Sequence, residues 1–171
     1  MDRGTLDLAR HNTWATAQVL KTLGGLDDTV LNATVPGTYG TILETIQHLV
    51  YSEGSYVFRL TGAWTAHPWK DDWNVGLDVL EERSAILGET LVRFLSDPWD
   101  SNKLGEARDD DGKVFAVPAG VFLTQIFHHA NEHRAHLCTM LGALGHDVPD
   151  VSGWGYSKAV GRSWVKSVEE R

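Results

Sequence analysis

Four histidines lie within the nine residues from His128 to His136, and they are half of the eight histidines in the chain. The segment has helical spacing, so His129, His133 and His136 stand at i, i+4 and i+7 and share one face. Neighbouring Cβ atoms on such a face are about 5–6 Å apart, which lets two neutral imidazoles bind one metal ion. The spacing therefore predicts a metal site on this helix. His128 lies about 100° around the helix from His129, and we expect it at a flank or an interface.

A further histidine, His48, stands in the middle of another apolar, periodic block. Small or polar residues share its face of the predicted helix: Thr41, Glu44, Thr45, Ser52 and Ser55. A structural histidine in a core is more often surrounded by leucine and valine. We therefore interpret this polar stripe as the wall of a wet, accessible cavity.

Long amphipathic blocks must position these histidines. Each block has apolar residues at helical spacing and ends at a glycine or a proline. They run from about 5 to 23, 41 to 61, 77 to 95 and 119 to 144. We expect all four to be helices, and the last to turn the face of His129 and His133 toward the bundle interior or its mouth.

The remaining segments complete the predicted architecture. Asp109-Asp110-Asp111-Gly112 is a turn pattern followed by a β-rich run, so a short hairpin is expected between about 103 and 117. A fifth, shorter helix is expected from about Tyr156 to Glu169. The connections are too long for a minimal bundle. The sequence thus predicts one all-α domain over residues 1–171, a four-helix bundle with long crossover connections.

Composition limits the class of protein. Fifteen Lys and Arg against 23 Asp and Glu give a net charge of −8, which disfavours binding to nucleic acid or to an anionic membrane surface. The single cysteine, Cys138, excludes an internal disulfide and is expected to be buried. The chain shows no signal segment or long apolar span, so we expect a cytoplasmic protein.

Three elements together resemble the DinB/YfiT family of bacterial metal-dependent enzymes. They are the Asn-x-Trp element at Asn12, the central histidine His48 followed by Glu53 and Tyr56, and the His-x-x-x-His-Arg motif from His129 to Arg134. The resemblance covers roughly residues 5–150. It implies an up-down-down-up four-helix bundle, usually a homodimer.

The resemblance also implies a divalent metal ion held by His48, His129 and His133, with its other positions open to water. The family often has glutamine where this chain has His136. His136 is therefore a candidate fourth ligand, a catalytic acid or base beside the metal, or an outward substitute. We expect Arg134 to pair with a carboxylate such as Glu44 or Glu53.

Imidazole ligands suit Zn²⁺ or Ni²⁺, and three protein ligands with a vacant position are typical of catalytic sites. Family members with assigned activities include thiol S-transferases and isomerases that use low-molecular-weight thiols such as bacillithiol or mycothiol. The leading hypothesis is a metal-dependent enzyme that activates a thiol or water for S-transfer to, or hydrolysis of, a small-molecule substrate. The alternative is a noncatalytic metal-binding or stress-response module, in which His136 or Glu132 closes the metal's shell.

Overall fold

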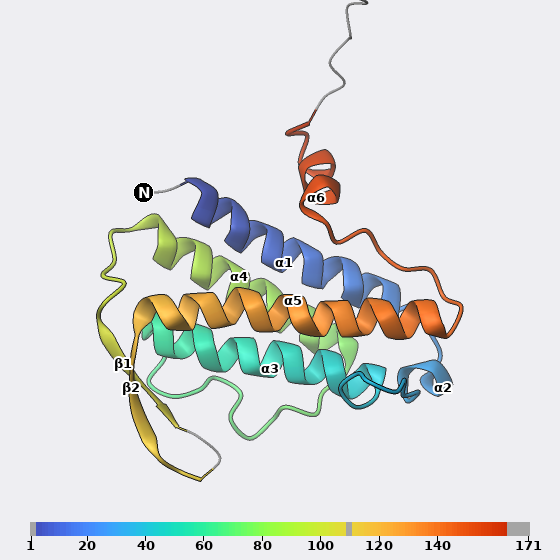
Figure 1. Cartoon of the computed structure of the whole chain (residues 1–171), viewed down its shortest axis with the longest axis horizontal. Coiled ribbons are helices and arrows are strands. Elements are labelled where there is room, and N and C mark those ends of the chain that lie inside the picture. The colour runs from blue at the N-terminus through green and yellow to red at the C-terminus, as the bar shows by residue number, and fades with distance from the viewer. Residues whose placement is uncertain (1–2, 109–110, 164–171) are drawn as a thin grey trace, which may run out of the picture.

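Long helices form a bundle in the computed structural model, which describes residues 3–108 and 111–163 (Figure 1). The four long helices are α1 (Arg3–Leu23), α3 (Ile42–Thr61), α4 (Leu77–Ser96) and α5 (Ala119–Ala143). Shorter elements join or follow them: α2 (Asp28–Leu31), β1 (Leu104–Arg108), β2 (Val114–Pro118) and α6 (Gly153–Ala159). The predicted helical bundle with a small hairpin is confirmed.

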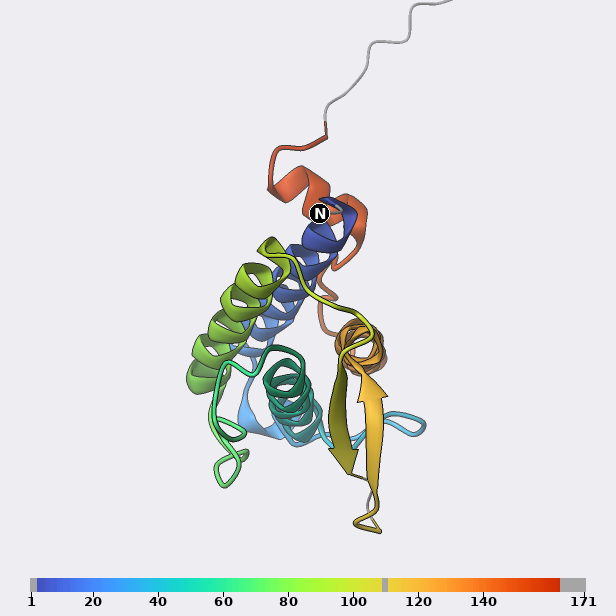
Figure 2. The ribbon, with the colours of Figure 1, turned by 90° about the vertical axis from the view of Figure 1, so that its left-hand side faces the viewer.

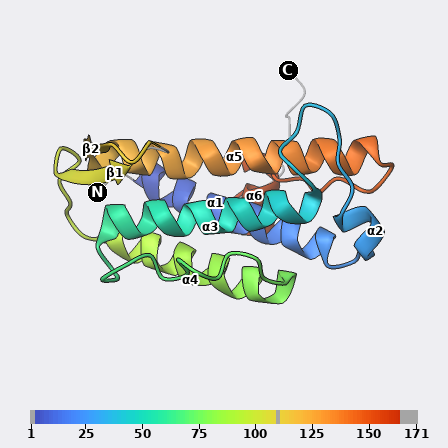
Figure 3. The same ribbon diagram turned by 90° about the horizontal axis from the view of Figure 1, so that it is seen from below.

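The long helices follow an up-down-down-up order. α1 and α5 run in one direction, and α3 and α4 run in the other (Figures 1 and 3). Around the bundle, α1 packs on α4, α4 on α3, α3 on α5, and α5 on α1. Because α3 and α4 are parallel, the chain between them must return along the whole bundle, which gives the long crossover predicted from the sequence.

The core is built from aliphatic side chains of all four long helices. Its fully buried members include Leu23, Ile42, Leu49, Leu87, Leu91, Ile126 and Leu137. Removal of this apolar surface from water is the main favourable contribution to folding. In the described part of the chain, no helix is long and apolar enough to cross a membrane.

The start of α3 is fixed by a capping box. The Thr41 hydroxyl accepts from the Glu44 amide at 3.1 Å, and the Glu44 carboxylate accepts from the Thr41 amide at 2.8 Å. These two bonds satisfy amide groups that the first turn of a helix leaves unpaired. The helix ends at Gly62, whose φ of 62° is left-handed. Both ends of α3, the helix that carries His48, are thus defined locally.

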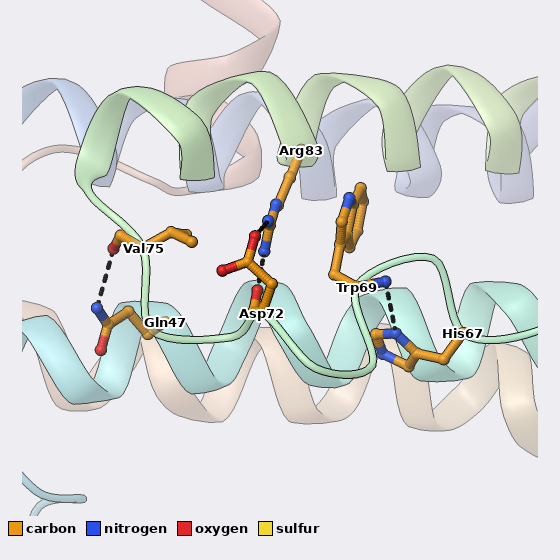
Figure 4. Close-up of polar contacts among 6 residues, drawn as sticks. All are labelled: Gln47, His67, Trp69, Asp72, Val75 and Arg83. Carbon is orange, nitrogen blue, oxygen red and sulfur yellow. Dashed lines mark hydrogen bonds and ion pairs between the residues drawn. The ribbon is translucent and has the colours of Figure 1, made fainter.

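The crossover from residue 62 to 76 is pinned to α3 and α4 (Figure 4). Arg83 of α4 forms an ion pair with Asp72 at 2.6 Å, and its guanidinium lies 4.9 Å from the centre of the Trp69 ring. The Gln47 amide of α3 donates to the Val75 carbonyl at 2.9 Å. Trp69 packs on Gly54, where a Cβ would lie 3.0 Å from the indole. These contacts hold the crossover against the bundle.

The hairpin projects beyond the bundle (Figure 2). Its antiparallel strands pair from Leu104 with Pro118 to Arg108 with Val114, and β2 leads directly into α5. The Ala119 amide donates to the Lys103 carbonyl at 2.8 Å, which anchors the base of the hairpin at the start of α5.

The predicted fifth helix was wrong in its limits. α6 begins at Gly153, because the Ser152 hydroxyl caps it by accepting from the Gly155 amide at 3.0 Å. It ends at Ala159, shortly before Gly161, whose φ is 68°. Residues 160–163 are not helical, and the rest of the predicted segment, 164–169, lies outside the described residues.

The contact between α1 and α4 depends on the missing side chain of Gly88. A Cβ there would lie 2.9 Å from Thr13 Cβ and 2.5 Å from its Cγ2, so we expect Gly88→Ala to destabilise the fold by about 1–3 kcal/mol through overpacking. At Gly142 of α5 the added Cβ meets Val148 at an ordinary 3.5 Å. Gly142→Ala should therefore be neutral or stabilising by up to about 1 kcal/mol. Urea unfolding checks both variants, and equal effects would contradict the close approach.

Candidate metal centre

Three histidines from two facing helices converge on one point. His48 comes from α3, and His129 and His133 come from α5, which lies beside α3 (Figure 3). Nε2 of His129 lies 3.2 Å from Nε2 of His48 and 3.1 Å from Nε2 of His133. The potential ligand atoms of all three residues lie within 4.8 Å of one another. The structure thus brings together the three residues singled out as metal ligands from the sequence.

The geometry of this cluster suits a small divalent ion. Two nitrogens at 2.0–2.1 Å from a tetrahedral zinc ion are roughly 3.3 Å apart, close to the two measured separations. The donors are all neutral nitrogens, a set that suits Zn²⁺ or Ni²⁺ better than Ca²⁺ or Mg²⁺, which prefer oxygen. The residues present therefore fit the metal that the sequence predicts.

Burial keeps the three rings uncharged. It lowers the pKa of His129 to about 3 and that of His133 to about 4, with a further decrease from the neighbouring imidazoles. Burial also lowers the pKa of His48. A charged ring in this group would lose hydration, and two charged rings at these distances would repel each other. At neutral pH all three are in the form that binds metal.

Tyr39 forms the outer rim of the cluster. Its ring stacks on His48 with centroids 4.4 Å apart and meets His133 edge to face at 5.2 Å. Its hydroxyl lies 3.3 Å from Nδ1 of His48, where it accepts the ring proton when Nε2 faces the metal. The Thr45 hydroxyl donates a hydrogen bond to the Tyr39 backbone carbonyl. Sequence reasoning missed Tyr39, because a loop has no periodicity to show which way a side chain points.

Tyr56, which lies further along α3 than His48, contacts the cluster from another side. Its ring meets His129 edge to face at 5.4 Å, and its hydroxyl accepts from the Gln125 amide at 3.5 Å. The sequence drew attention to Tyr56 as part of a motif but assigned it no role. Its contact with His129 limits how that ring can rotate.

The polar stripe around His48 differs from the predicted cavity wall. Thr41 and Glu44 form the capping box of α3. Thr45 is fully buried and bonds to backbone carbonyls, and the Ser55 hydroxyl accepts from Arg59. These groups satisfy local backbone and side-chain partners, a competing use of Ser and Thr that periodicity does not reveal.

The other histidines lie outside the cluster. His136 contacts His133 edge to face, with ring centres 5.6 Å apart, but is not among the grouped ligand atoms. The His128 side chain is 74% exposed, 4.0 Å from Glu132, which agrees with the predicted flank position.

His11 lies on α1 and not on this helix. Its Nε2 lies 2.9 Å from the Val151 carbonyl, and its ring contacts Tyr156 of α6. His11 therefore ties the C-terminal segment to α1.

A buried polar network adjoins the three-histidine cluster. Arg134 donates to Asn12 Oδ1 at 2.9 Å and to Thr16 at 3.0 Å. The Asn12 amide in turn donates to Glu53 Oε1 at 2.9 Å. Arg134 thus reaches Glu53 through Asn12, while Glu44, the other predicted partner, is held in the capping box. Burial raises the pKa of Glu53 to about 7, although the Arg134 charge and the Asn12 bond act in the opposite direction.

Comparisons with known proteins give a consistent result. The model of the DinB family matches residues 1–163. The chain shares its fold with a DinB-like protein of Bacillus subtilis, at 12% identity and a TM-score of 0.63 over 88% of this chain and 99% of the other. A DinB-like protein of Bacillus cereus is similar at 20% identity and a TM-score of 0.61, over 87% and 96%. No curated protein matches this chain.

The raised pKa of Glu53 makes stability depend on pH. Its carboxyl keeps a proton up to about pH 7 when folded but ionises from about 4.5 when unfolded, so the folded state binds more protons in that interval. The contribution of Glu53 to stability then falls as pH rises from 4.5 to 7, by up to about 3 kcal/mol. Glu53→Gln removes this titration and keeps an acceptor for Asn12.

Urea unfolding at pH 5 and pH 8 tests this expectation. The free energy of unfolding of Glu53→Gln, taken relative to that of the unsubstituted protein, should be higher at pH 8 than at pH 5. Substitution of the exposed Glu81 of α4 by glutamine is the matched control, and its relative stability should stay constant. A constant difference for Glu53→Gln as well would refute the assignment.

Proposed function

The chain belongs to the DinB family, and from this premise we propose that it is a metal-dependent enzyme acting on a small-molecule substrate. The observation that carries the proposal is the convergence of the Nε2 atoms of His48, His129 and His133. We propose Zn²⁺ or Ni²⁺ as the ion, which when bound lowers the pKa of a water molecule or thiol in its open position.

The number of ligands favours catalysis over a purely structural metal. Structural zinc sites are closed by four protein ligands, whereas catalytic sites keep a position free. His136 stands outside the group of ligand atoms, and the Glu132 side chain is 53% exposed beside His128. A noncatalytic module with a closed shell would need one of these two residues to move onto the ion.

The chain's own residues bind the ion, orient its ligands and restrict access to it. Tyr39 and Tyr56 limit the rotation of His48 and His129 through ring contacts. The Tyr39 side is the open one, because this residue is 43% exposed, and we assign substrate entry to it. The proposed reaction is S-transfer with a low-molecular-weight thiol as co-substrate, or hydrolysis with water in its place. Homodimerisation, which the family implies, is part of the same proposal.

Metal analysis tests the site directly. The purified protein should carry a stoichiometric divalent ion, and His129→Ala should lose it, because one of three ligands is removed from a buried cluster. His128→Ala is the matched control, since that neighbouring histidine is exposed, and it should retain the ion. Circular dichroism should show the same helical content in all three proteins. Full metal occupancy in His129→Ala would eliminate the proposed site.

A chelator-controlled screen tests the reaction. Conjugation of small thiols to electrophiles, and hydrolysis of small esters and amides, should be measured with and without chelator. We expect activity that disappears on chelation, returns with added Zn²⁺ or Ni²⁺, and is absent from His129→Ala. A metal-loaded protein with a fourth protein ligand in its coordination shell would instead support the noncatalytic alternative.

A further inference from the structure

Two buried side-chain nitrogens have no hydrogen-bond partner among the described residues: Nδ1 of His133 and Nδ1 of His136. Buried polar atoms are nearly always paired, and an unpaired one requires an explanation. Here the two atoms belong to neighbouring rings, which meet edge to face with centres 5.6 Å apart. Their proximity indicates that one interaction accounts for both.

The proposed metal site determines which of the two nitrogens is the donor. Nε2 of His133 faces Nε2 of His129 at 3.1 Å, so a neutral His133 that offers Nε2 to an ion carries its proton on Nδ1. A metal-ligating histidine normally donates this outer N–H to an acceptor that fixes the ring. His48 has Tyr39 for that purpose, but His133 has no such partner among the described residues.

His136 is placed to be the missing acceptor. It lies three residues after His133 on the same face of α5, and the two rings are already in contact. The neighbouring carboxylate, Glu132, is directed toward His128 at the surface instead. The two Nδ1 atoms are not bonded to each other in the structure, so a bond between them requires a rotation of the His136 ring about its Cβ–Cγ bond.

We propose that His136 is a positioning residue, which accepts a hydrogen bond from Nδ1–H of the ligand His133 and so fixes the ring on the metal. This inference rests on the proposed function, because it assumes that His133 binds an ion through Nε2. It gives His136 a role beside the metal and not on it. His136 carries its own proton on Nε2 in this arrangement.

Paired substitutions separate hydrogen bonding from ring packing. His136→Phe keeps an aromatic ring in contact with His133 and removes both nitrogens, whereas His136→Gln keeps an acceptor. His128→Phe is the matched control, because it removes an exposed histidine from the same helix. The zinc dissociation constant of each protein is measured by competition with a chromophoric chelator, and helical content is checked by circular dichroism.

We expect His136→Phe to weaken zinc binding about 10–100-fold, as loss of an outer partner of a metal ligand typically does. His136→Gln should recover most of the affinity, and His128→Phe should not change it. In ¹⁵N-resolved imidazole spectra of the zinc-loaded protein, the Nδ1–H proton of His133 should be protected from exchange. The protection should persist in His136→Gln and disappear in His136→Phe.

The outcomes distinguish this inference from the function on which it rests. If the unsubstituted protein binds neither Zn²⁺ nor Ni²⁺, the proposed function fails and this inference fails with it. If that protein binds zinc and His136→Phe binds it equally well, only the positioning role is overturned. A change in coordination number of the cobalt-substituted protein on His136→Phe also overturns it, because it makes His136 a ligand. Should His136→Phe misfold, affinity loss in a folded His136→Gln contradicts the role, and retained affinity with a protected proton supports it.

Discussion

The geometry of the three-histidine cluster depends on a buried network that links α1, α3 and α5. Arg134 immediately follows His133, and Glu53 is five residues beyond His48 on the facing helix. Asn12 joins them, since its amide oxygen accepts from Arg134 and its amide nitrogen donates to Glu53. A buried charge without partners is strongly unfavourable, so α1 must lie where one short side chain reaches both groups. The same requirement sets the spacing of α3 and α5, and therefore the distance between His48 and the histidine pair.

The charge state and the geometry of the three-histidine cluster both favour the binding of a cation. Three uncharged imidazoles direct their Nε2 atoms at a common point, at separations of 3.1 and 3.2 Å where measured. Burial and mutual repulsion oppose protonation of His129 and His133, so protons do not readily neutralise the converging lone pairs. Two carboxylates of α3, the helix that carries His48, are engaged elsewhere: Glu44 in the cap of α3 and Glu53 on Asn12. A divalent ion that prefers nitrogen ligands would satisfy the nitrogens that face one another.

Local sequence signals predicted the elements well and their contacts poorly. The helical blocks, the hairpin and the pairing of His129 with His133 on one face follow from period, turn residues and spacing, which are properties of short segments. The approach of His48 to that pair depends on how two distant helices pack, and it was available only through the family resemblance. Tyr39 and Asn12 act across the fold, so nothing beside them in the sequence indicates their partners. The hydroxyls near His48 were misinterpreted because capping and backbone bonding compete with solvent for the same groups.

His136 illustrates how helix geometry divides roles among residues on one face. His129 and His136 share a face at i and i+7, but they are about 10 Å apart along the helix axis. The ligand atoms of one tetrahedral ion, each 2.0–2.1 Å from it, lie within roughly 4 Å of one another, and in this structure His136 lies outside the group formed by His48, His129 and His133. The pair at i and i+4 fits, and the third nitrogen has to come from another helix, which is the position that His48 fills. In this structure α5 thus supplies two of the three nitrogens and α3 the third, and a substrate would reach an ion held there past Tyr39, which is 43% exposed.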